Sequence, residues 1–243
     1  MSYSNNLTSE RCIKRVILIM SSKGGVGKST ITYHLARTLA LNELNIGVLD
    51  ADIYSPSQPT LFKCQDEYME ADTDQHGKTT AFPVEKHNIK IASMGFVIQE
   101  NNAVAVRGHR LSQIFDAFID QIQWGDLDFL LVDMPPGTGD IHISAAQKLK
   151  PDAAIIVGTT RELDIADIYR TENFLRQMSI PILGIVDNMT QNKADEIANK
   201  LSIPCLSNIP VYSDGELEAE FNDSIKILTN NFIEYFDKCD DKI

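Results

Sequence analysis

The chain has 243 residues, of which 22 are Lys or Arg and 34 are Asp or Glu, giving a formal net charge of −12. This length suits one large α/β domain with a sizeable core. The acidic balance argues against broad nucleic-acid binding through bulk charge, although a local basic patch stays open.

The N-terminal region carries no pattern of a targeting or membrane segment. Its apolar run, residues 13–20, is broken by Lys14 and Arg15 and is too short for a signal sequence or a membrane span. We therefore expect a cytoplasmic protein without nucleic-acid or membrane partners. We also expect a loose polar segment at 1–14, followed by a single domain at 15–243.

A glycine-rich stretch, SSKGGVGKST at residues 21–30, lies between a predicted strand at 16–20 and a predicted helix. The helix is indicated by Ile31, Leu35 and Leu39, which recur at helical spacing. Strand, glycine-rich loop and helix N-terminus form the context in which a Walker A loop binds phosphate. The residues expected to hold the nucleotide here are Gly24, Gly25, Val26, Gly27, Lys28, Ser29 and Thr30.

Two side chains of this loop have expected chemical roles. Lys28 is expected to reach the β- and γ-phosphates, and the Ser29 hydroxyl is expected to ligate Mg²⁺. The loop departs from the usual pattern, because Ser22 stands where the first glycine would be and Lys23 precedes the glycines. A glycine-rich turn with incidental charges is the alternative, and the flanking strand and helix favour the phosphate site.

Further strands and helices alternate along the chain. Apolar runs predict strands at 45–50, 89–94, 128–133, 153–158 and 182–187. Apolar residues at helical spacing predict helices near 110–122, 165–178 and 231–243. The polar segment 63–86 breaks this rhythm and is an excursion or a β-hairpin insert. The alternation predicts a doubly wound, mostly parallel sheet with helices on both faces, and ligands at the carboxyl ends of its strands.

Three aspartates follow predicted strands. Asp50 and Asp52 lie at the end of the strand at 45–50, and Asp133 lies at the end of the strand at 128–133. Asp133 is expected to polarise the Mg²⁺ shell, Asp50 to lie near the metal, and Asp52 to orient the attacking water. Taken singly, each could be a helix cap or a turn residue. Two such sites beside a phosphate loop favour a catalytic role.

The PPGTG stretch after Asp133 is suited to sensing the γ-phosphate, through a backbone N–H of Gly137 or Gly139. The NKAD tetrapeptide at 192–195 matches a guanine-reading motif, but it does not directly follow a strand. We therefore interpret it as a chance match.

The remaining chemistry-bearing residues give weaker signals. No two cysteines form a C-x-x-C pair, and reduced thiols are expected at Cys12, Cys64, Cys205 and Cys239. His34, His76, His87 and His142 have no metal-ligand spacing and are assigned no role, and Trp124 is expected to pack in the core.

Several stretches together resemble one family. SSKGGVGKST resembles the deviant Walker A loop of the MinD/ParA class of ATPases, which includes the nitrogenase iron protein. Five further stretches resemble the Mrp/ApbC branch of that class, namely LDADIYSPSQP, VRGH, WGDLDFLLVDMPPGTGDIHISAAQK, PILGIVDNM and SNIPV. The resemblance covers residues 15 to about 221, and DMPPGTGD is its most specific part.

The resemblance implies an ATP- and Mg²⁺-dependent homodimer with slow turnover. In this class the first lysine of the loop, here Lys23, reaches across the dimer to the partner's nucleotide and stabilises charge on the transferring phosphoryl group. The resemblance also implies nucleotide-binding roles for Asn188, at the adenine edge, and for Pro210.

Members of this branch carry or assemble iron–sulfur clusters, commonly through a C-x-x-C pair that this chain lacks. Cys205 is the nearest candidate ligand, and one thiolate per subunit gives two per dimer where a cluster usually takes four ligands. Ser55 and His109 are smaller departures, because the family usually has Gly and Pro there.

Three functions stay open at this point. The first is an ATPase switch in iron–sulfur cluster or metallocofactor assembly. The second is a ParA/MinD-like positioning ATPase that binds a protein cargo through ATP-gated dimerisation, without carrying a cluster. The third is a non-hydrolysing nucleotide-binding module.

Overall fold

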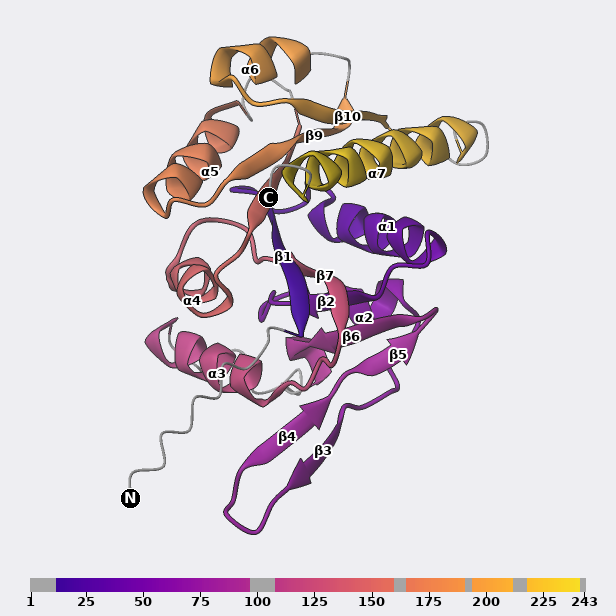
Figure 1. Ribbon diagram of the computed structural model, residues 1–243. Helices are drawn as coiled ribbons and strands as arrows, with labels where there is room; N and C mark the ends of the chain where they lie inside the picture. The colour runs from indigo at the N-terminus through magenta and orange to yellow at the C-terminus, as the bar shows by residue number, and fades with distance from the viewer. Residues whose placement is uncertain (1–11, 97–107, 160–164, 191–193, 212–217, 241–243) are drawn as a thin grey trace.

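The computed structural model describes residues 12–96, 108–159, 165–190, 194–211 and 218–240 (Figure 1). Most of the expected N-terminal segment, part of the VRGH stretch and the first two residues of NKAD therefore lie outside the described residues. Among the described residues, no helix is long and apolar enough to cross a membrane.

Eight strands form one sheet in the order β10-β9-β8-β1-β7-β2-β6-β5. Their neighbours pair in parallel, except for β5, which is antiparallel to β6 at one edge. The strands are β1 (Ile13–Met20), β2 (Ile46–Asp50), β5 (Val84–Lys86), β6 (Ile89–Ser93), β7 (Leu127–Asp133), β8 (Ala153–Gly158), β9 (Ile182–Thr190) and β10 (Cys205–Pro210).

Helices cover both faces of this sheet, as Figure 1 shows. One face carries α1 (Lys28–Leu41), α2 (Gln58–Leu61) and α7 (Glu218–Asp240). The other face carries α3 (Gly108–Gln121), α4 (Asp140–Leu149), α5 (Ile165–Gln177) and α6 (Ala194–Leu201), and a 3-10 turn, η1 (Met94–Phe96), follows β6. The doubly wound, mostly parallel α/β fold predicted from the sequence is confirmed.

Alternate residues of the central strands enter opposite cores. In β1, Val16, Leu18 and Met20 pack in one hydrophobic cluster, whereas Ile17 and Ile19 pack in the other. A strand buried on both faces reads as a continuous apolar run, which is why its sequence shows no alternation. Both clusters end at the carboxyl ends of the strands, where polar side chains begin.

The strands expected at 45–50, 89–94, 128–133, 153–158 and 182–187 all form, within a few residues of the expected ends. The sequence analysis missed β5, β10, α2 and α4, which are short or lie beside proline and glycine. The C-terminal helix begins at Glu218, well before the expected residue 231. Phe232 and Phe236 of this helix pack in the core, and Trp124 packs there as expected.

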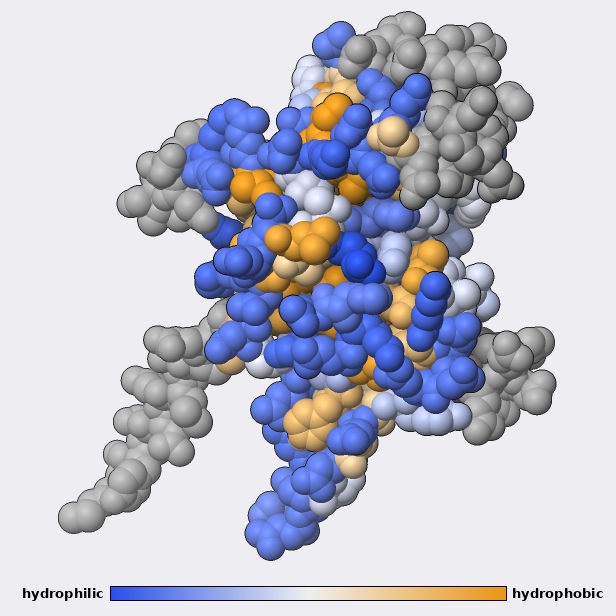
Figure 2. Space-filling model, turned by 90° about the vertical axis from the view of Figure 1, so that its right-hand side faces the viewer, coloured by the Kyte–Doolittle hydropathy of each residue, from blue (hydrophilic) through white to orange (hydrophobic). Residues whose placement is uncertain are grey.

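The polar segment at 63–86 contains a separate antiparallel hairpin, β3 (Glu70–Thr73) with β4 (Thr79–Phe82). Every residue of β3 is exposed. Figure 2 shows this hairpin projecting at the bottom of the molecule, mostly hydrophilic, with a hydrophobic patch at its base. Tyr68 and Phe82 are exposed large side chains of this region.

Candidate nucleotide site

The loop between β1 and α1 curls tightly because two of its glycines adopt left-handed backbone angles. Gly25 has φ of 78° and Gly27 has φ of 84°, a region that side chains other than glycine rarely adopt. A Cβ on Gly27 would also lie 2.1 Å from Nδ2 of Asn188. The loop therefore needs glycine at this position for both conformation and space.

A cavity of about 600 Å³ opens over this loop. Nine of the residues predicted from the sequence line it, namely Lys23, Gly24, Gly25, Val26, Gly27, Lys28, Ser29, Thr30 and Asp52. Its other walls come from Ser21, from the segment after β2 and from Pro136. The N-terminus of α1 faces this cavity, and its backbone N–H groups and dipole favour an anion there.

Lys28 and Asp133 form a buried ion pair at this site. The Lys28 Nζ lies 2.5 Å from Oδ1 of Asp133, and the two side chains are 7% and 0% exposed. The second carboxylate oxygen of Asp133 accepts a hydrogen bond of 2.8 Å from Nε2 of Gln58. The same Nε2 donates to the backbone carbonyl of Ser29 at 3.0 Å, so Gln58 joins Asp133 to the phosphate loop.

Asp50 is fully buried beside this pair. Its carboxylate accepts hydrogen bonds from the backbone N–H groups of Asp52, Ser57 and Gln58 and from the Ser93 hydroxyl. Burial, followed by the nearby Asp133 carboxylate, raises the Asp50 pKa to about 7, and these hydrogen bonds offset the rise only in part. A cation near this carboxylate would favour its charged form.

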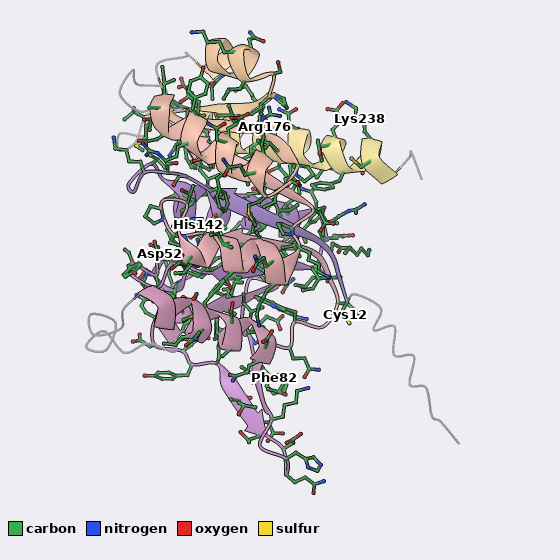
Figure 3. The ribbon with its side chains drawn as sticks, turned by 90° about the vertical axis from the view of Figure 1, so that its left-hand side faces the viewer. Cys12, Asp52, Phe82, His142, Arg176 and Lys238 are labelled. Carbon is green, nitrogen blue, oxygen red and sulfur yellow. The ribbon has the colours of Figure 1, made fainter. Side chains whose placement is uncertain are left out.

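Asp52 holds the loop after β2 in a turn. Its Oδ1 accepts the backbone N–H groups of Tyr54 and Ser55, each at 3.1 Å. The side chain is 7% exposed and lines the cavity. Figure 3 shows Asp52 and His142 on the same side of the molecule, with Cys12, just before β1, on the opposite side.

Asn188 contacts the phosphate loop from β9. Its Nδ2 donates to the backbone carbonyl of Val26 at 2.8 Å, so the adenine-edge residue expected from the resemblance also supports the loop. Pro210 ends β10, where it pairs with Thr190. Neither Asn188 nor Pro210 is part of the cavity lining.

Cys205 lies apart from the cavity. It begins β10, which is three strands from β1 in the sheet, and neighbouring strands are about 4.8 Å apart. Its Sγ is 3.6 Å from Oδ1 of Asn208. Within the described residues, no group of three His, Cys, Asp or Glu side chains is placed to hold a metal ion.

A family model described as the NUBPL iron-transfer P-loop NTPases of the ParA group matches residues 12–231. The chain belongs to this family. Among the most similar relatives is an iron-sulfur cluster carrier protein of Aquifex aeolicus, 36% identical over 82% of this chain and 58% of its own length. The cytosolic Fe-S cluster assembly factor CFD1 of Kluyveromyces lactis is 35% identical over 82% of this chain and 77% of its own length.

Solved structures agree with the family assignment. A nucleotide-binding protein of Archaeoglobus fulgidus in complex with ADP has a TM-score of 0.69 and 31% identity, covering 93% of this chain and 89% of its own. MinD of Pyrococcus horikoshii with Mg-ADP has a TM-score of 0.66 at 18% identity, covering 88% and 94%, and so shows the shared fold. The chain spans less than two thirds of the first bacterial carrier proteins it matches, 58% and 62% of their lengths.

Two residues of this candidate site escaped the sequence analysis. Gln58 was not singled out, although its side chain contacts Asp133 and the loop carbonyl of Ser29. His142 was assigned no role, although it is buried and both its ring nitrogens bond to the PPGTG loop. The spacing of His142, three residues after Gly139, is the signal that the sequence offered. A side chain three residues after the N-cap residue of a helix often accepts the N–H of that residue.

Proposed function

We propose that the chain is an ATP-hydrolysing homodimeric switch that works in iron–sulfur cluster or metallocofactor assembly. The observation that carries the ATPase part is the buried Lys28–Asp133 pair beside a cavity lined by the phosphate loop. The role in cluster assembly is supported by the iron-transfer family and by relatives that are cluster carriers or assembly factors.

Nucleotide binding would move the Lys28 ammonium from the Asp133 carboxylate to the phosphates. The ammonium now neutralises Asp133, and the β- and γ-phosphates would offer it charged oxygens a short distance away. Asp133 would keep its hydrogen bond from Gln58 while it loses the lysine. The loop N–H groups and the α1 N-terminus would bind the remaining phosphate oxygens.

The donor set beside the phosphate loop fits Mg²⁺, which prefers oxygen ligands and keeps several waters. Ser29 lines the cavity, and Asp50 and Asp133 are buried close by. The Oε1 of Gln58 is a buried side-chain oxygen without a hydrogen-bond partner among the described residues, which leaves an acceptor unused next to this place. Ser29, Asp50 and Asp133 would hold the ion, directly or through water, and Mg²⁺ there would neutralise charge on the phosphates.

Two side chains on the cavity lining would complete the reaction. Oδ1 of Asp52 is used by Tyr54 and Ser55, which leaves its second oxygen to orient the attacking water. Lys23 is exposed on the lining, as expected of a lysine that reaches the nucleotide of a partner subunit. A cation supplied by the partner would tie hydrolysis to dimer formation.

The test of the ATPase part is phosphate release and sedimentation of the wild type, Lys23→Ala and Lys28→Ala. We expect slow ATP-dependent turnover and ATP-dependent dimers in the wild type. Both substitutions should lower turnover sharply. Unchanged turnover in both variants would contradict the mechanism.

The test of the cluster part is anaerobic reconstitution with iron and sulfide, followed by metal analysis and an absorption spectrum. We expect a cluster per dimer that is lost in Cys205→Ser. If no iron binds under conditions that load a relative with a C-x-x-C pair, the chain would instead be an ATP-gated switch for a protein cargo. That is the second candidate function, and it is favoured by the absence of a C-x-x-C pair from the sequence.

A further inference from the structure

His142 ties together both ends of the loop that follows Asp133. The Gly139 N–H donates to the His142 Nδ1 at 3.1 Å, and Nε2 lies 2.9 Å from the carbonyl oxygen of Pro135. A carbonyl only accepts, so Nε2 carries the ring hydrogen and Nδ1 carries the lone pair. The side chain is 2% exposed. One buried neutral ring therefore fixes the distance between residues 135 and 139.

Capping of α4 accounts for only half of this arrangement. Gly139 is the N-cap residue of α4, and a side chain at the third helical position often accepts the N-cap N–H. The second bond, from Nε2 to Pro135, reaches back beyond the helix and serves the loop instead. Phe174 of α5 packs edge-on against the imidazole, with ring centroids 6.0 Å apart, and restricts its orientation.

Pro136, directly before Gly137 in this loop, lines the nucleotide cavity. Gly137 has φ of 101°, and its N–H donates to the carbonyl of Ser21 at 2.9 Å. Ser21 and Pro136 both line the cavity. The Gly139 N–H is held by the buried His142 ring, whereas the Gly137 N–H bonds to Ser21, a residue of the cavity lining. Of the two glycines that the sequence left open as the γ-phosphate sensor, the geometry therefore selects Gly137.

We propose that His142 is a positioning residue for recognition of the γ-phosphate. It holds Pro135 and Gly139 in place, so that the Gly137 N–H can leave the Ser21 carbonyl for the terminal phosphate while the ends of the loop stay fixed. ADP has no γ-phosphate, so the bond from Gly137 to Ser21 persists when ADP is bound. The inference rests on the proposed function, in which the cavity binds ATP.

The test compares the affinities for a non-hydrolysable ATP analogue and for ADP, both with Mg²⁺, by titration calorimetry. We expect His142→Leu to weaken analogue binding about tenfold, the worth of one hydrogen bond to a charged group, and to leave ADP binding within about twofold. His142→Gln should recover most of the loss, because its amide offers one acceptor and one donor. A merely structural role would change both affinities together.

The matched control is His34→Leu. His34 is a partly buried histidine of α1 whose ring packs against Tyr33 and Phe221, away from the PPGTG loop. We expect both affinities to stay within about twofold of the wild type, since no hydrogen bond to a phosphate is lost.

The outcomes separate this inference from the proposed function. A wild type that binds neither nucleotide would overturn the proposed function and the inference together. A wild type that binds both, with an unchanged affinity ratio in His142→Leu, would overturn the inference alone. If the leucine variant does not fold, the inference is still tested by the glutamine variant and by the nitrogen NMR spectrum of the wild-type His142 ring, which shows which ring nitrogen carries the hydrogen. A hydrogen on Nδ1 at neutral pH would overturn the inference.

Discussion

The carboxyl end of the sheet, called here the nucleotide edge and formed by residues 21–30, 50–58 and 133–139, differs sharply from the cysteine edge, which is the strand β10 that begins at Cys205. At the nucleotide edge, the buried carboxylates of Asp50 and Asp133 have several hydrogen-bond or ion-pair partners. At the cysteine edge, Cys205 is a partly exposed thiol. A nucleotide site can thus be built largely within one subunit, whereas a cluster needs ligands beyond one Cys205 per chain.

The largest expected effect comes from Lys28→Ala at the nucleotide edge. Removing the lysine takes away its contact with the phosphates and leaves Asp133 buried without its cation. We expect hydrolysis to fall at least about 1,000-fold, and the free energy of unfolding to fall by about 3 kcal/mol. Phosphate release and urea unfolding measure the two effects. Near-normal values of both would show that this edge does not carry the activity.

A smaller loss is expected for Lys23→Ala, because in the proposed mechanism this exposed side chain acts only in the dimer. We expect hydrolysis to fall about 100-fold or more, as for other cations supplied in trans, with nucleotide affinity of the monomer nearly unchanged. Mixing this variant with Lys28→Ala provides the control, since a mixed dimer has one intact site. Recovery of activity on mixing supports action across the dimer, and no recovery contradicts it.

The pH dependence of stability should reveal the buried His142. Burial lowers its pKa from the ordinary 6.5 to about 4, so the unfolded chain takes up a proton first as the pH falls. Its contribution to stability is therefore full above pH 6.5 and is lost towards pH 4, a change of about 3 kcal/mol. Urea unfolding of wild type and His142→Gln should show the wild type losing more stability between pH 7.5 and 5.

The ionisation of Asp50 changes stability with pH in the opposite direction to that of His142. Its pKa is raised from 3.8 to about 7, so its contribution to stability is lost as the pH rises through 7. This contribution is common to the wild type and His142→Gln, and it cancels in their difference. Equal pH profiles for the two proteins would contradict the buried neutral state of His142.

Asn188 lies on β9, between the nucleotide edge and β10. Its replacement tests how far along the sheet side chains affect nucleotide affinity. Asn188→Ala removes the hydrogen bond to the Val26 carbonyl and the expected adenine contact. We expect ATP affinity to fall about tenfold, the worth of one or two hydrogen bonds, with reduced preference over GTP. Asn208→Ala, on β10, is the control and should leave affinity unchanged. An equal loss in both variants would indicate a general disturbance of the sheet.

The smallest effect on ATP hydrolysis is expected for Cys205→Ser. The cysteine lies outside the cavity, so turnover should stay within about twofold, while iron bound after reconstitution should fall to background. Cys64→Ser is the control, because that buried thiol has a pKa raised to about 11 and is a poor source of thiolate. Iron loss in both variants would argue against a specific ligand.

The sequence was enough to bring the residues of the nucleotide edge together, because their pattern is local. The loop is contiguous, and Asp50 and Asp133 directly end strands, so parallel pairing brings them to the same place. Gln58 and His142 could not be found in this way. Their roles depend on where α2 and α4 pack, and both helices are short and lie beside proline or glycine.

The edge strand β10 escaped prediction for a related reason. Its CLSNIP sequence contains two polar residues and a final proline, so it lacks the continuous apolar run of the central strands. Ser207 is nevertheless buried, because its hydroxyl donates to the Ser224 carbonyl of α7. Such a contact depends on a helix distant in sequence, which local patterning does not reveal.

The β3–β4 hairpin offers a site at which the protein can be labelled. Its tip, around the turn from Asp74 to Lys78, is exposed and stands clear of the body, and none of its residues line the nucleotide cavity. Insertions are best tolerated at exposed turns of this kind. A dye or affinity tag placed there would let single molecules be followed through assembly without altering the core that holds the nucleotide.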